Sequence, residues 1–152
     1  MSVVSSAHAL NSAKGSEQMR DLAEKIDYLI KKEDLPWDRR GGTVVVSLYP
    51  GARKQHVWFS RRGEVYVFLS IIAGREVVAR NQRRKRELAR SVWRKNALNE
   101  IVTFAFDDQD RLIGVVEQPV ATIDHEEVRG YIEALARECD RFEYALTGED
   151  AG

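Results

Sequence analysis

The 152-residue sequence has little of what builds a reaction centre or a membrane anchor: one cysteine, Cys139, three histidines and three prolines. One cysteine excludes an intrachain disulfide and is typical of the reducing cytosol, so we expect a cytoplasmic protein. No run reaches about 18 apolar residues, so no membrane-spanning segment is predicted. Residues 1–8 lack the basic start and apolar block of a signal peptide.

Recognisable catalytic and metal-binding motifs are also absent. His8, His56 and His125 stand far apart, whereas a zinc site needs about four converging ligands. The acidic segment 107–110 lacks the central glycine and the later glutamate of an EF-hand. There is no Gly-x-Ser-x-Gly, Walker A or Gly-x-Gly-x-x-Gly pattern. We therefore expect no metal, no cofactor and no catalytic residue, and a protein that is not an enzyme.

The composition is that of one globular domain, with 43% apolar and 32% charged residues. Residues 1–15 are rich in Ser, Ala and Asn without periodicity, which predicts a flexible N-terminal arm. The single domain is then expected over residues 16–147, with a tail at 148–152.

Hydrophobic periodicity predicts the elements of this domain. Apolar residues at three- and four-residue steps predict a helix capped by Ser16 that ends before Pro36. Three strands follow at 43–49, 55–60 and 64–70, with turns at Pro50–Gly51 and Arg62–Gly63. We then expect a helix at 83–97, a hairpin with strands at 101–106 and 112–118, and a last helix from its cap Asp124 to Leu146.

The predicted order is α-β-β-β-α-β-β-α. Strands joined by short turns are antiparallel, so the sequence predicts an α+β fold with a five-stranded antiparallel sheet packed with helices.

The predicted sheet has too many large apolar residues on one side. An antiparallel sheet with one wet face alternates cleanly between apolar and polar residues. Here the side opposite Val57 and Phe59 carries Trp58, and we place Tyr66 and Phe68 with it. Either a helix of the same chain or another molecule covers these three rings. We take Trp58, Tyr66 and Phe68 as candidate protein-binding residues.

Charge is unevenly distributed although the whole chain is neutral, with 24 basic and 24 acidic residues. Residues 107–150 hold 13 acids and 4 bases, a net charge of −9, so the remainder carries +9. The segment Arg80–Lys95 alone has eight bases and one acid, Glu87. This basic helix is a solvated face, a contact for a protein partner, or a nucleic-acid contact that grips phosphates. The candidate anion contacts are Arg83, Arg84, Lys85, Arg86 and Arg90.

Three stretches of the second half resemble a known family. The first is Leu88–Leu98, a helix that ends in an asparagine-containing turn. The second is Thr103–Leu112, which resembles the family's hairpin pattern F-x-x-D-x-x-G-x-L. The third is Pro119–Val128, with a proline, a linker and an acidic helix start. Residues 136–140 add the matching part of the last helix. In these about 60 residues the chain resembles the YbjN-like family, which shares the fold of type III secretion chaperones.

The resemblance implies a non-enzymatic protein, often a homodimer, that holds an extended segment of a client protein. This sequence departs from those chaperones in its strongly basic middle helix. Our first hypothesis is a protein-binding module that uses the aromatic face. The alternative is a nucleic-acid-associated stress regulator that uses the basic helix Arg80–Lys95.

Overall fold

The structure is a computed structural model that describes residues 2–48, 53–99 and 101–151, with side chains described over 15–48, 53–99 and 101–146. Its elements follow in chain order: α1 (Ser2–Glu33), β1 (Trp37–Arg40), β2 (Thr43–Ser47), β3 (Lys54–Arg62), β4 (Val65–Ala73), α2 (Arg75–Val78), α3 (Gln82–Leu98), β5 (Thr103–Phe106), β6 (Leu112–Pro119), the 3₁₀ turn η1 (Val120–Thr122) and α4 (His125–Ala151).

The strands form one antiparallel sheet in the order β1-β2-β3-β4-β6-β5. The α+β class is therefore confirmed, but the sheet has six strands and not five. The additional strand is β1, with the sequence Trp-Asp-Arg-Arg. It has only one apolar residue, so it lacks the alternation of apolar and polar residues that predicts a strand. Gly41 (φ +59°) and Gly63 (φ +62°) make the turns at β1–β2 and β3–β4 in a backbone region that favours glycine. The predicted Pro50–Gly51 turn lies outside the described residues.

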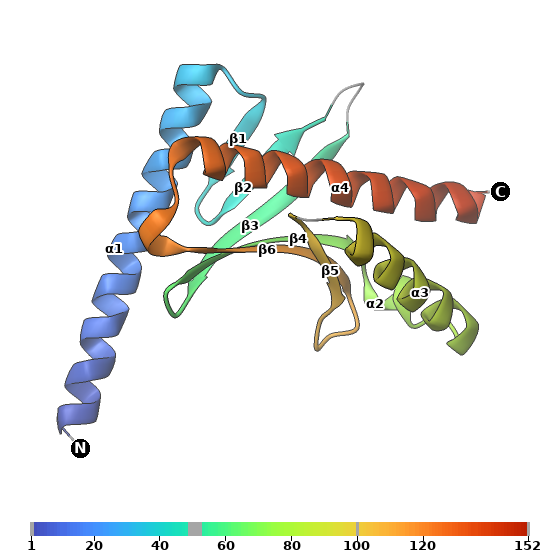
Figure 1. Cartoon of the computed structure of the whole chain (residues 1–152), viewed down its shortest axis with the longest axis horizontal. Helices are drawn as coiled ribbons and strands as arrows, with labels where there is room; N and C mark the ends of the chain where they lie inside the picture. The colour runs from blue at the N-terminus through green and yellow to red at the C-terminus, as the bar shows by residue number, and fades with distance from the viewer. Residues whose placement is uncertain (1, 49–52, 100, 152) are drawn as a thin grey trace.

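One face of the sheet is covered by the chain's own helices. Seen along its edge in Figure 1, the sheet lies beneath α4, and α1 crosses one end. The predicted apolar stripe of α4 is buried in full, and most apolar residues of the sheet face that it covers are buried too. Buried residues of the stripe and of the covered face include Val128, Ile132, Leu135, Cys139, Phe142, Val44, Val57, Phe59, Phe68 and Val116. This two-layer arrangement contains the core.

An ion pair and a hydrogen bond hold α1 to the sheet. The Nε and Nη2 atoms of Arg39 in β1 donate to the two carboxylate oxygens of Asp27 at 2.6 and 2.8 Å. These hydrogen bonds lower the pKa of Asp27 and raise that of Arg39. The Tyr66 hydroxyl donates to the Gln18 backbone oxygen at 2.8 Å. These polar contacts add to the apolar packing of α1, whose buried residues are Leu22, Ile26 and Leu29.

The terminal helices are longer than the sequence predicts. The helix α1 begins at Ser2, so residues 2–15 are its first turns and Ser16 is not its cap; α4 continues past Leu146 to Ala151. The first half of α1 extends beyond the sheet in Figure 1, and its sequence has no apolar periodicity from which a helix could be predicted. Asp124 is confirmed as the cap of α4, because its side chain accepts from the Glu127 N–H at 2.8 Å.

Close packing of α4 on β6 depends on Gly114. A Cβ built at Gly114 would overlap the Cys139 Sγ and would lie 3.1 Å from Leu135 Cδ1 and 3.3 Å from Val102 Cγ1. The absence of a side chain at this position is therefore what lets helix and strand approach.

We predict that Gly114→Ala destabilises the fold by about 1–3 kcal/mol, because the added methyl overpacks the helix–sheet contact. The double variant Gly114→Ala with Cys139→Ala should recover part of this loss, since removing the sulfur opens space for the methyl. Urea unfolding of both variants, with Cys139→Ala alone as control, measures the coupling. Purely additive effects would contradict the proposed contact.

Candidate functional site

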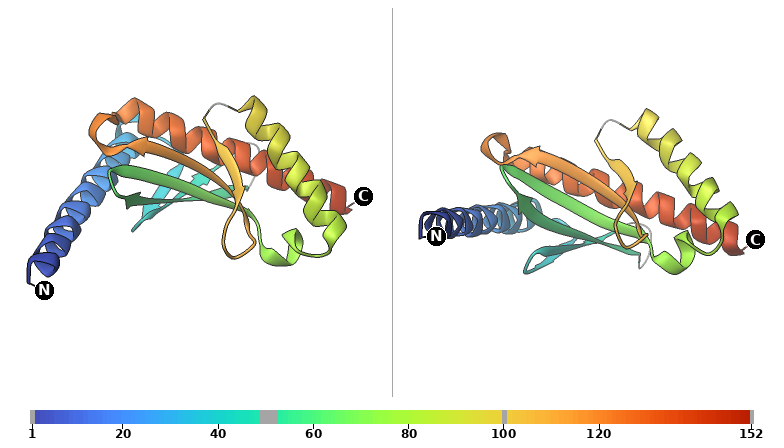
Figure 2. Two further views of the ribbon diagram at one scale, coloured as in Figure 1. Left: turned by 60° about the horizontal axis from the view of Figure 1, so that its bottom comes forward. Right: turned by 90° about the horizontal axis from the view of Figure 1, so that it is seen from below.

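The second face of the sheet carries no helix among the described residues. Seen from below in the right-hand view of Figure 2, the strands lie in front of α4 and nothing crosses them. We call this surface the open face. Residues that pair across neighbouring antiparallel strands share a face, so the register identifies its members. One unbroken row crosses five strands: Thr43, Trp58, Leu69, Val115 and Thr103.

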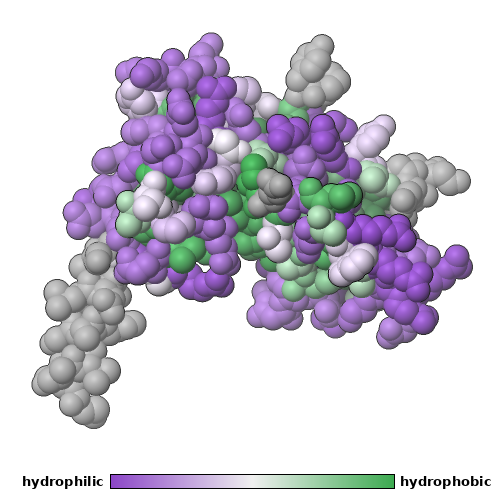
Figure 3. Space-filling view, in the orientation of Figure 1, coloured by the Kyte–Doolittle hydropathy of each residue, from purple (hydrophilic) through white to green (hydrophobic). Residues whose placement is uncertain are grey.

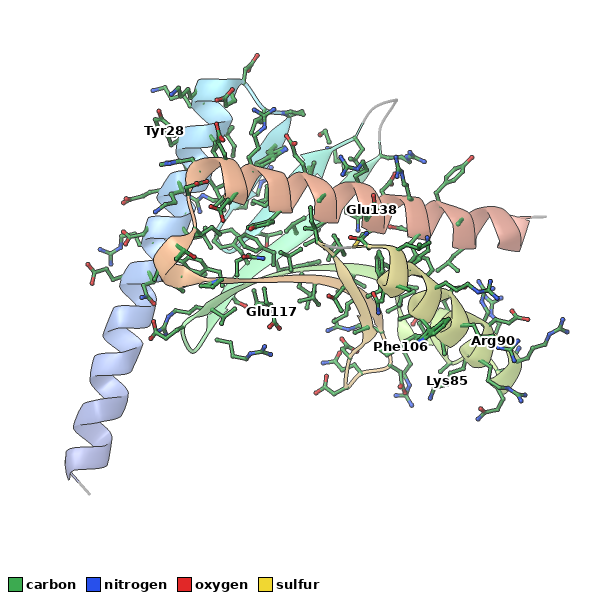
Figure 4. The ribbon with its side chains drawn as sticks, in the orientation of Figure 1. Tyr28, Lys85, Arg90, Phe106, Glu117 and Glu138 are labelled. Carbon is green, nitrogen blue, oxygen red and sulfur yellow. The ribbon has the colours of Figure 1, made fainter. Side chains whose placement is uncertain are left out.

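Trp58 lies at the centre of the open face and is 40% exposed. Its ring stacks on that of His56 with centroids 5.9 Å apart. Leu69 and Val115, the next two members of the row, are half-buried. Figure 4 shows Glu117, two residues along β6, pointing to the side away from α4. The middle of the open face is therefore apolar: Val67 and Ile71 flank Leu69 along β4, and His56 and Glu117 are polar residues nearby.

Tyr66 and Phe68 do not belong to this surface, so the predicted grouping of three rings is wrong. Phe59 pairs with Phe68, whereas Trp58 pairs with Leu69, which places the two aromatic residues of β4 on the covered face. Tyr66 is 3% and Phe68 0% exposed. The Phe68 ring lies 6.4 Å from that of Tyr131 in α4, and burial raises the pKa of Tyr66. A helix of the same chain thus covers both rings, and only Trp58 is open to another molecule.

The open face is hollowed near both ends of its central row. A depression of about 530 Å³ lies over β1, β2 and β3 and includes Thr43, Val45 and His56. A second depression of about 460 Å³ lies over β5 and β6 and includes Ile101, Thr103 and Val115. Two features of the sequence indicate this face: the alternation that sets Val65, Val67, Leu69 and Ile71 on one side of β4, and the apolar Ile101 before β5.

The outer edge of β5 is closed by a side chain. Asn96 of α3 donates from Nδ2 to the Phe104 carbonyl at 2.9 Å and accepts from the Phe104 N–H at 2.7 Å. The amide therefore takes the place of a neighbouring strand at this residue, and blunts the edge against pairing with another chain. An added strand at Phe104 would have to displace α3.

The predicted anion contacts all lie on α3, and most have partners within the chain. Arg83 pairs with Glu87 at 3.1 Å and Lys85 approaches Asp110 at 4.0 Å. The Arg86 Nε donates to the Gln82 carbonyl at 3.4 Å. Arg84 is half-buried, whereas Arg90 is exposed. Figure 3 shows the strongly hydrophilic surface that these residues make over α3. The five cations are on one helix but do not converge on one point.

Nothing in the described part of the chain resembles a reaction centre. No three His, Cys, Asp or Glu side chains among these residues come together as a metal site requires. Burial raises the pKa of the Cys139 thiol to about 12, so the sulfur is protonated and inert at neutral pH. Both Asp107 carboxylate oxygens accept hydrogen bonds from its own turn, at 2.7–2.9 Å. No described helix has the length and hydrophobicity to cross a membrane.

Solved structures share this fold, although no family model and no curated protein matches the sequence. The complex of ExsC with ExsE matches with a TM-score of 0.55 and 17% identity, over 87% of this chain and 95% of that one. The type III secretion chaperone SycH of Yersinia pestis, in complex with a stable fragment of YscM2, matches with a TM-score of 0.51 and 9% identity, over 80% and 98%. YbjN from E. coli matches with a TM-score of 0.52 and 11% identity, over 85% and 91%.

The chain therefore has the fold of the type III secretion chaperones and of YbjN, as the resemblance of its second half predicted. At these identities the likeness defines the architecture: an antiparallel sheet with helices on one side. What the open face and the basic helix do has to be argued from this chain's own residues.

We predict that Trp58→Ala changes the stability by about 1 kcal/mol or less, because the ring is 40% exposed and packs only on surface neighbours, among them His56 of its own strand. Phe68→Ala should cost about 3–5 kcal/mol, since it leaves a cavity beneath α4. Urea unfolding of the two variants compares them directly. Equal losses would mean that both rings belong to one layer, contrary to the register.

We also predict that Cys139 reacts with a thiol reagent at pH 8 only as fast as the protein unfolds. The folded-state pKa of about 12 lies above the usual thiol value, so the protonated form is favoured in the folded protein. Because the thiol ionises more readily in the unfolded chain, the free energy of unfolding should fall as pH rises above about 8.5, and should be unaffected by this group at lower pH. The control is the urea-unfolded protein, which should react at once; fast reaction of the folded protein would contradict the burial.

Proposed function

We propose that the protein is a non-enzymatic protein-binding module that holds an extended segment of a partner protein on the open face. The observation that carries the proposal is the central row, an apolar strip of Trp58, Leu69 and Val115 that no described part of the chain covers. A sheet face that is left open and apolar is a surface that soluble proteins use for contacts.

The dimensions of the row suit a short extended segment. From β2 to β5 it crosses four strand spacings of about 4.8 Å, or about 19 Å in all. An extended chain rises about 3.3 Å per residue, so about six residues would span it. The depressions that include Thr43 at one end and Thr103 at the other would receive side chains from the two ends of such a segment.

Trp58 is the residue expected to contribute most of the binding energy. A tryptophan desolvated at the centre of an interface typically costs about 2 kcal/mol or more when truncated to alanine. Leu69 and Val115 provide apolar surface beside it, and the two threonines close the row with hydroxyls that can accept or donate hydrogen bonds. This arrangement, an aromatic centre with a polar rim, is that of protein interfaces.

The structural neighbours support the proposal by analogy of fold. ExsC is seen with ExsE, and SycH with a fragment of YscM2, so this architecture holds protein partners in other chains. The same analogy supports a protein without catalytic activity, since SycH is a chaperone. Nucleic-acid binding has no such support from these neighbours.

The homodimer that the resemblance implies is part of the same proposal. Trp93 and Leu98 of α3 are 74% and 86% exposed, and a second copy that covered them would bury apolar surface now in water. A cytoplasmic location stays a prediction from the single cysteine.

A photo-crosslinking amino acid tests the proposal. With p-benzoylphenylalanine at position 58, irradiation in native lysate should give discrete adducts with a partner segment. The matched position is Tyr144, which is 65% exposed on α4 and away from the open face. Adding Leu69→Asp should lower the yield at position 58 about tenfold, because a carboxylate in the apolar strip opposes docking.

Circular dichroism of each variant checks that the fold is intact. The proposal fails if position 58 gives no more adduct than position 144, or if the yield at 58 is unchanged by Leu69→Asp in a folded protein.

A further inference from the structure

The helices α3 and α4 enclose a groove that shares no residue with the open face. It has a volume of about 390 Å³ and lies between the middle of α3 and the last described turns of α4. Figure 4 places Arg90 on α3 at the side of the molecule where the two helices run next to each other.

The two walls of this groove differ in chemistry. The α3 wall carries four cations, Arg84, Arg90, Arg94 and Lys95, against the one acid Glu87, a balance of +3. The described residues of the α4 wall, Phe142, Ala145 and Leu146, are uncharged and apolar. The Lys95 Nζ lies 4.7 Å from the centre of the Phe142 ring. A ligand in the groove would therefore meet positive charge on one side and, on the other, an uncharged wall on which Ala145 is exposed while Phe142 and Leu146 are 2% and 7% exposed.

The cations of α3 are arranged against the stability of their own helix. Arg86, Arg90 and Arg94 follow one another at four-residue steps, and like charges at that spacing repel. The first turn has no acid and contains Arg83, Arg84 and Lys85 at the positive end of the helix dipole. Arg83 pairs with Glu87 and Lys85 approaches Asp110, so an anionic partner in the groove would chiefly relieve the repulsion between Arg90 and Arg94.

We propose that this groove binds an acidic amphipathic segment of a partner protein, with carboxylates facing the α3 wall and apolar side chains facing the α4 wall. Charge complementarity selects the carboxylates, and bidentate pairing suits arginine at Arg90 and Arg94. The apolar wall selects a polypeptide with hydrophobic residues on one side. The inference goes beyond the open face, because it concerns a second surface and does not depend on the first.

A peptide fits this surface better than a nucleic acid. Single strands bind through a positive groove combined with exposed aromatic rings on which bases stack. The aromatic residue of this groove, Phe142, is 2% exposed and offers no face to a base. The exposed ring of α3, Trp93, does not line the groove.

The test uses a fluorescent 16-residue peptide with glutamates on one helical face and leucines on the other, and measures anisotropy at low salt. Two control peptides carry glutamine for glutamate or serine for leucine. Wild-type protein should bind the first peptide at least about tenfold more tightly than either control, since both walls contribute. Binding should weaken as salt is raised, because exposed charges are screened.

Paired variants distinguish binding in the groove from binding to the overall positive charge of α3. Arg90→Glu with Arg94→Glu reverses two lining cations and should weaken peptide binding about tenfold or more. Lys85→Glu with Arg86→Glu makes the same change in net charge on the same helix outside the groove, and should leave binding within about twofold. Both pairs are at exposed positions, and circular dichroism ensures that each is folded.

Four results would overturn the inference. The first is equal behaviour of the two variant pairs, and the second is no binding of the acidic peptide by the wild type. The third is tighter binding of a single-stranded 20-mer oligonucleotide that is lost in Arg90→Glu with Arg94→Glu. The fourth is a wild-type dimer that becomes monomeric in the same variant by sedimentation, which would make a second copy the occupant.

Discussion

The contact of α4 with β4 and β6 is the constraint on which the rest of the structure depends. Gly114 on the strand and Cys139 on the helix allow an approach that any side chain at position 114 would prevent. This approach buries one stripe of α4 and one face of the central strands, and it contains the largest part of the core. A domain of this size can form one two-layer core, so the helix that covers one face leaves the other without cover.

The functional surfaces follow from that one-sided burial. Because α4 occupies the covered face, the remaining apolar residues of β3, β4 and β6 lie on the open face, where Trp58 is at the centre. Because α4 continues past the sheet, its last described turns face α3 and form the wall of a groove lined with arginines. The same helix thus determines where an apolar surface and a basic surface are exposed.

Much of the fold could be predicted from the sequence, because periodicity records burial. The apolar stripe of α4 and the cap at Asp124 were read correctly, since both are local patterns. The strand β1 was missed because pairing at an edge needs backbone partners, which the sequence Trp-Asp-Arg-Arg does not reveal. The first turns of α1 were missed because residues 2–15 show no apolar periodicity.

The candidate site was harder to predict, because it depends on which residues of different strands share a face. Alternation within β4 separates Phe68 from Leu69, but it does not say which of them joins Trp58. Only the pairing register of β3 with β4 decides this, and a shift by one residue would exchange the two faces. The closure of the β5 edge by Asn96 was likewise invisible, since it joins a helix and a strand through a side-chain amide.

The two surfaces differ in a way that decides how a partner would respond to its environment. Contacts with the apolar strip around Trp58 depend on removing hydrocarbon from water and change little with ionic strength. Contacts with Arg90 and Arg94 depend on exposed charges and weaken as salt rises, since the screening length falls to about 8 Å at physiological ionic strength. A partner that engaged both would retain the salt-insensitive part of its affinity at high salt. Because the two sites lie on one rigid frame, joining the two segments on a single chain would also raise the effective concentration of the second after the first has bound.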